Sequence, residues 1–181
     1  MCYIPIQPEA TTDYLDIAFK SATICIALFN AYFAIKIFKD KNKKDDTEKE
    51  RDRKIQLLKT LVLDHGFKNF YTIFDEIEDE LLKLKEPNLT DLDKQTIDSN
   101  IQDLFIKLRR KFYNSLLAIE ETLYDNIENK CDELQSHLSL TIFDPGVNLS
   151  HTPKYDDLIN EKLINAKTEI IKKIFGYRGG Q

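Results

Sequence analysis

The chain has 181 residues and a formal net charge of −5, with 42% hydrophobic and 31% charged residues. This length suits one domain, or one domain plus an anchor, and the composition excludes a disordered chain. The negative charge argues against a nucleic-acid-binding protein that relies on an overall basic surface. The few Gly and Pro residues, five of each, and the lack of sustained alternation predict an all-α protein.

The first predicted element is an apolar helix over residues 14–38, whose only charges are Asp16, Lys20 and Lys36. As a helix, residues 17–38 would extend roughly 33 Å, enough for a bilayer core of about 30 Å. Apolar side chains cover the whole circumference, as expected of a transmembrane helix. Two alternatives remain: the central helix of a soluble bundle, and a cleaved signal peptide, although residues 1–13 lack the basic residues that a signal peptide needs.

The charges that flank this segment predict its orientation. Acidic residues precede it, and lysines follow it in the charged linker predicted over residues 39–46: Lys39, Lys41, Lys43 and Lys44. An excess of Lys marks the cytoplasmic side and favours contact with anionic lipids. The sequence therefore predicts a single-pass protein of the inner or plasma membrane, with residues 1–13 outside and the rest in the cytoplasm.

A cytoplasmic domain of three to five amphipathic helices is predicted over residues 47–176. A capping box at Thr47 and Glu50 would begin it, and Gly66 would end or kink its first helix. Six residues in strict three-four spacing then form an apolar seam that would pack against another chain or inside the monomer. We call them the aromatic seam: Phe67, Phe70, Phe74, Ile77, Leu81 and Leu84.

Later boundaries follow from Pro, Gly and capping residues. Pro87 breaks the chain, and Thr90 or Asp91 can cap the next helix. One apolar stripe follows as far as Leu138, which leaves open whether residues 91–142 form one helix or two joined near Tyr124. The pair Pro145-Gly146 ends this region. Thr152 is predicted as the cap of the last helix, Gly176 as its C′ residue, and residues 177–181 as a flexible tail.

No motif indicates catalysis, so we expect no enzyme activity and no cofactor. Glu133 and His137, one helical turn apart, form an exposed pair or, less simply, two metal ligands. Cys131 is expected in the core rather than in a disulfide. A basic cluster, Lys107, Arg109, Arg110 and Lys111, is a candidate anion contact, and the near-balanced charge favours its pairing with the acidic run 75–80.

The sequence predicts a function in protein–protein interaction, as a non-enzymatic scaffold or accessory subunit. Self-association is a further expectation, because Asn30 could form a hydrogen bond across a dimer of anchor helices. One alternative is a nucleic-acid or nucleotide sensor that uses the basic cluster. Another is an accessory or effector subunit of a bacterial defence or toxin–antitoxin system, which rests only on the small, anchored, helical design.

Overall fold

The computed structural model describes residues 14–180, and side chains from residue 17 onward. The predictions for residues 1–13 lie outside this range. Every regular element within it is helical, as the sequence predicts. The chain divides into two compact units, Met1–Glu48 and Lys49–Gln181.

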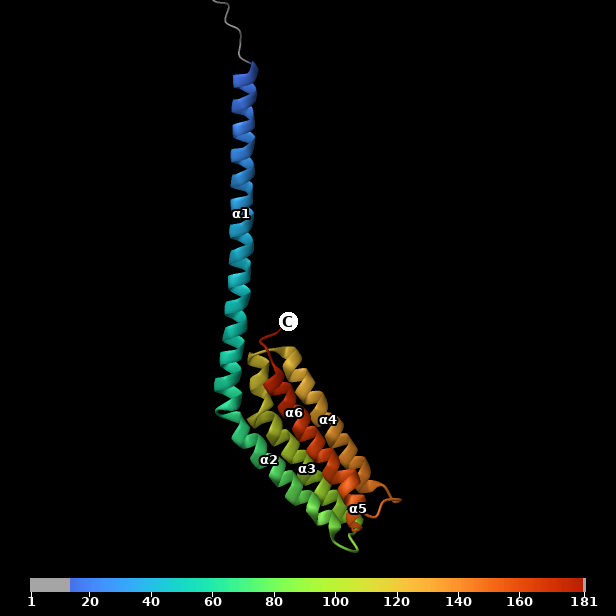
Figure 1. Ribbon diagram of the computed structural model, residues 1–181. Helices are drawn as coiled ribbons and strands as arrows, with labels where there is room; N and C mark the ends of the chain where they lie inside the picture. The colour runs from blue at the N-terminus through green and yellow to red at the C-terminus, as the bar shows by residue number, and fades with distance from the viewer. Residues whose placement is uncertain (1–13, 181) are drawn as a thin grey trace, which may run out of the picture. The chain divides into compact units, whose positions relative to one another are not determined.

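Helix α1 (Tyr14–Leu57) is 44 residues long and unbroken (Figure 1). The predicted linker over residues 39–46 is therefore helical. The capping box predicted at Thr47 is wrong, because the Thr47 hydroxyl donates to the carbonyl oxygens of Lys43 and Lys44 inside the helix. The physical reason is composition: residues 39–57 contain neither Gly nor Pro and are rich in Lys, Glu and Arg, which favour helix.

The chain turns after α1 through a π-helical segment, η1 (Leu58–Leu63), and α2 (Gly66–Leu82) follows. The predicted break at Gly66 is confirmed, although Gly66 begins a helix rather than ending one. A Cβ atom on Gly66 would lie 3.2 Å from the Phe112 ring and 3.4 Å from the carbonyl oxygen of Leu61. Glycine thus allows the start of α2 to pack closely on the residue that ends α3.

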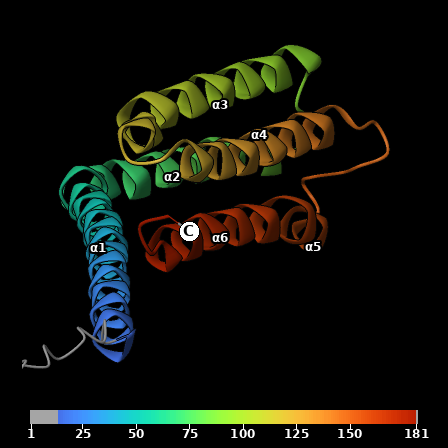
Figure 2. The same cartoon turned by 90° about the horizontal axis from the view of Figure 1, so that it is seen from above.

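Lys49–Gln181 is a four-helix bundle of α2, α3 (Asp91–Lys111), α4 (Glu121–Phe143) and α6 (Glu161–Gly176). Successive helices run in opposite directions (Figures 1 and 2), as short connections require. A 3-10 turn, η2 (Lys83–Lys85), ends α2. The short α5 (Thr152–Tyr155) and the π-helical η4 (Asp156–Asn160) lead into α6.

Two helices, not one, occupy residues 91–142. The break lies at Phe112–Glu120, around the 3-10 segment η3 (Tyr113–Ala118), and not at the expected Tyr124. The Ser115 hydroxyl donates to the Phe112 carbonyl oxygen, a local bond that competes with helix. The apolar stripe continues through the break because Tyr113 and Leu116 in the 3-10 segment, and Phe112 and Ile119 beside it, stay buried.

The residues that cap the helices agree with the sequence predictions at α3 and differ by one residue at the last helix. Thr90 caps α3 in a capping box with Asp93, and the hydrogen bonds from Thr90 lower the pKa of the Asp93 carboxyl. Asn88 provides the preceding turn with a positive φ of 65°. The predicted cap of the last helix is one residue off, because His151 is the N-cap and Thr152 is already helical. Gly176 is the last helical residue, and Tyr177 follows as the C-cap.

Candidate interaction surfaces

The apolar segment of α1 is exposed along its whole length. Every side chain from residue 17 to residue 38 is exposed, including Phe19 at 76% and Leu28 at 66%. Within the described chain, α1 is the one helix that is long and apolar enough to cross a membrane, by length and composition. Exposed apolar surface on this scale marks a site of contact with lipid or protein.

The polar side chains within this segment differ in whether they form hydrogen bonds within the helix. The Ser21 hydroxyl donates to the carbonyl oxygen of Ala18, and the Thr23 hydroxyl to that of Phe19. Both hydroxyls are thus satisfied within the helix, as a membrane requires. Asn30 is exposed and has no hydrogen-bond partner among the described residues, so its amide is available to another molecule.

The four lysines predicted to contact lipid, Lys39, Lys41, Lys43 and Lys44, are all exposed on the helical continuation of α1. Together with Lys36 they provide five cations within nine residues. Their position directly after the apolar segment gives the helix a basic collar.

The aromatic seam lies inside the bundle. Five of its six residues are at most 1% exposed, and Phe67 is partly buried. Phe70 packs its ring 4.6 Å from that of Phe74 and 4.8 Å from that of Phe112, measured between centroids. The seam is therefore used within the monomer, the second of the two interpretations above, and in the folded chain it is not available to a partner.

The basic cluster is divided between paired and free cations. The Lys107 ammonium binds the Glu76 carboxylate, with Nζ 2.8 Å from Oε1. Arg109 binds Glu128 at 2.7 Å, and its Nε donates to the Tyr113 hydroxyl, a bond that raises the pKa of the guanidinium. Arg110 and Lys111 are exposed and make no ion pair with any described residue. The predicted pairing with the 75–80 run holds for Lys107, and only Arg110 and Lys111 remain as anion contacts.

Glu133 and His137 are engaged with protein groups. Nε2 of His137 lies 2.8 Å from the carbonyl oxygen of Leu158, which connects α4 to η4, and Glu133 pairs with Lys130. No group of three or more potential metal ligands occurs among the described residues. The pair thus has a structural explanation.

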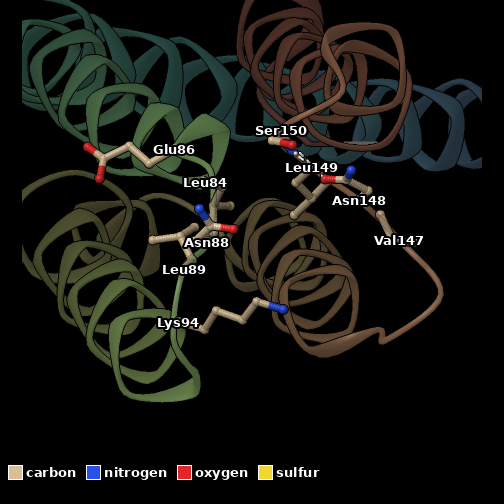
Figure 3. A pocket seen from close by; sticks show the side chains of 9 residues that line it. All are labelled: Leu84, Glu86, Asn88, Leu89, Lys94, Val147, Asn148, Leu149 and Ser150. Atoms are coloured by element: carbon tan, nitrogen blue, oxygen red, sulfur yellow. Dashed lines mark hydrogen bonds between the residues drawn. The ribbon is translucent and has the colours of Figure 1, made fainter.

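A small cavity of about 180 Å³ lies between the α2–α3 and α4–α5 loops (Figure 3). Leu84, Leu89 and Leu149 provide its apolar wall, and Lys94 is at its rim. Asn148 is committed to its own loop, since its Oδ1 accepts from the backbone and hydroxyl of Ser150. The volume is below the 300–1,000 Å³ typical of ligand sites, and the two charged residues of the lining, Glu86 and Lys94, form no ion pair with each other.

The C-terminal residues pack on the bundle, where the sequence predicted a flexible tail. The Tyr177 hydroxyl donates to Oε2 of Glu120 at 2.5 Å, and Lys54 pairs with the same oxygen at 3.7 Å. The Tyr177 hydrogen bond is the main cause that lowers the pKa of Glu120. Gly179 is buried against Arg51. Sequence reasoning missed this contact, and the two glycines near the C-terminus were its only signal.

No family model, curated protein or solved structure matches this chain. A function is therefore proposed from the residues and contacts of the chain itself.

Proposed function

We propose that the protein is a single-pass membrane protein whose helical bundle binds another protein on the cytoplasmic side of the inner or plasma membrane. The observation that carries the proposal is the apolar segment 17–38, which is helical and exposed throughout. In water, this much apolar surface would be strongly unfavourable, and a bilayer core of about 30 Å matches its length. The basic collar supports the orientation, because lysines favour the cytoplasmic side.

Cys25 provides a native probe of this segment. It is exposed on the helix, so lipid is what would shield it. In intact membranes a membrane-impermeant maleimide should leave Cys25 unmodified, and the same reagent should modify it after detergent and denaturant are added. Rapid modification of Cys25 in intact membranes would contradict the anchor.

Protein binding is supported by surface residues of the bundle other than the aromatic seam. Tyr71 on α2 and Phe175 on α6 are 43% and 59% exposed, and their rings lie 5.8 and 5.5 Å from that of Phe67. Exposed aromatic residues are enriched in protein interfaces.

The binding of a partner can be tested by photocrosslinking in living cells. A benzophenone amino acid at Tyr71, Phe175 or Leu140 should give discrete protein adducts from at least one of these exposed positions. The same amino acid at Phe74, which is 1% exposed, tests whether adducts require a surface position. If membrane-inserted protein gives no adduct from any exposed position, partner binding is contradicted.

Self-association is a separate part of the proposal and depends on Asn30. A cysteine at Asn30, in a chain with Cys2 and Cys25 replaced by Ser, should form disulfide-linked dimers in membranes. Leu28 is nearly opposite on the helix and provides the matched control position. Equal crosslinking at both positions would indicate random collision, and none at Asn30 would remove the homodimer.

A further inference from the structure

The charged residues of the bundle segregate along its long axis. The half formed by residues 51–74, 101–132 and 168–180 contains 13 Lys and Arg and nine Asp and Glu. The other half, residues 75–100 and 133–167, contains six Lys and Arg and 14 Asp and Glu. One end is therefore net basic and the other is strongly acidic. We call them the basic end and the acidic end.

Contacts within the bundle establish that the segments of each end lie together. At the basic end, the ring of Phe67 lies 5.8 Å from that of Phe112 and 5.5 Å from that of Phe175, so the start of α2 meets the ends of α3 and α6. At the acidic end, Lys85 pairs with Asp156 and lies over the Tyr155 ring. The polarity is thus a property of the folded bundle.

Six cations at the basic end are exposed and make no ion pair or hydrogen bond with any described residue. They are Lys59, Lys68, Arg110, Lys111, Lys172 and Arg178. Helix dipoles account for only some of them, because cations are favourable at helix C-termini, such as the end of α3. Lys68 is in the first turn of α2, where the dipole disfavours a cation.

We infer that the basic end binds the anionic surface of the membrane in which the protein is anchored. This inference rests on the proposed anchor. Ten residues, 39–48, separate the apolar segment from the bundle unit, which would be roughly 15 Å of helix. The bundle unit begins at Lys49, directly before the first segment of the basic end, so this end is the one tethered near the lipid. Each Lys or Arg near an anionic surface adds attraction, and the acidic end is repelled.

Lysine acetylation footprinting of the full chain in lipid nanodiscs tests this contact. Discs of phosphatidylcholine alone are compared with discs that also contain phosphatidylserine, and each lysine is followed by mass spectrometry. Phosphatidylserine should slow acetylation of Lys59, Lys68, Lys111 and Lys172 roughly fivefold. Lys154 and Lys162 at the acidic end are exposed and make no ion pair or hydrogen bond with a described residue, and their rates should not change. High salt should abolish the protection.

A paired variant separates lipid attraction from other causes. Arg110→Gln with Lys111→Gln should weaken the protection of Lys59, Lys68 and Lys172, whereas Lys154→Gln with Lys162→Gln should not. Fast acetylation of these lysines in both kinds of disc would overturn the inference and leave the anchor intact. Slow acetylation at the same rate in both kinds of disc would indicate a contact with protein and would also overturn the inference. A chain that fails to enter nanodiscs would refute the anchor and this inference together.

Discussion

Glu120 connects three parts of the chain that are far apart in sequence. Its carboxylate accepts hydrogen bonds from the hydroxyls of Tyr177 and Thr122 and pairs with Lys54 of α1. These contacts favour the ionised form, which is why the pKa of Glu120 is lowered. A carboxyl group whose pKa is lower in the folded than in the unfolded chain stabilises the fold at any pH above the unfolded-state pKa. This stabilisation is lost as the pH falls through the pKa of the folded state.

The Tyr177→Phe variant tests this hydrogen bond. At pH 7 the variant should lose about 1 kcal/mol or less of unfolding free energy, and the difference should shrink as the pH falls through the lowered pKa of Glu120. Urea unfolding in detergent, followed by circular dichroism, measures it. Tyr71→Phe is the matched control, because the Tyr71 hydroxyl has no hydrogen bond to a described residue. A pH-independent loss in Tyr177→Phe would contradict the account.

Cys131 is a second test at the residue scale. The thiol is 1% exposed, and burial raises its pKa to about 12. Since the thiolate is the reactive form, the folded protein should resist alkylation at Cys131 at pH 8, and denaturant should expose it. Mass spectrometry after a maleimide pulse identifies the site. Fast alkylation of Cys131 in folded protein would mean that the α3–α4 core is open.

The packing of the C-terminal segment depends on Gly179. Gly179 has a φ of +89°, and a Cβ atom there would collide with the Arg51 side chain and lie 2.8 Å from the Arg51 carbonyl oxygen. Gly179→Ala should therefore release the segment from α1, at a cost of about 1–3 kcal/mol. Hydrogen exchange at residues 49–57 should become faster.

Gly176→Ala is the control for this experiment, because a Cβ atom at Gly176 meets no atom within 4 Å. The Gly176 variant should exchange like the wild type or more slowly, since Ala favours helix over Gly. If the two variants exchange alike, the C-terminal contact does not stabilise the end of α1.

Element boundaries marked by special residues could be predicted from the sequence. Helix α3 begins after the Thr90 cap that follows Pro87. Helix α4 ends at Phe143, just before Pro145-Gly146. The break at residues 112–120 could not, because a 3-10 segment keeps the same side chains buried and the apolar stripe unbroken. The helix start predicted at Thr47 is wrong, because a Thr followed three residues later by Glu also occurs inside a continuous helix such as α1.

The candidate sites show a second limit of sequence reasoning. An apolar seam such as Phe67–Leu84 has the same spacing whether it packs on another chain or on its own bundle, so only the fold decides. The pairing of Lys107 with Glu76 could be predicted, because the numbers of acidic and basic residues in the chain are nearly balanced. The polarity of the bundle could not be read from the chain order, because the basic end is formed by three separate segments.

At the scale of the whole molecule, hydrophobicity and charge change along the chain. An apolar helical segment is followed by a lysine collar and then by a closed bundle with one basic and one acidic end. The proposals for lipid contact, partner binding and self-association all depend on whether residues 17–38 enter a membrane. That is the central claim.

Membrane fractionation tests this claim most directly. The full-length chain should stay in the membrane pellet after alkaline carbonate extraction and enter solution only with detergent. In the matched variant, Leu28→Arg with Phe29→Arg, each charge at the centre of the segment opposes insertion by about 2.5–3.5 kcal/mol. Both side chains are exposed and do not contribute to the described core. This variant should be released by carbonate. A wild-type chain that remains soluble without detergent, or that fractionates like the double-arginine variant, would contradict the account.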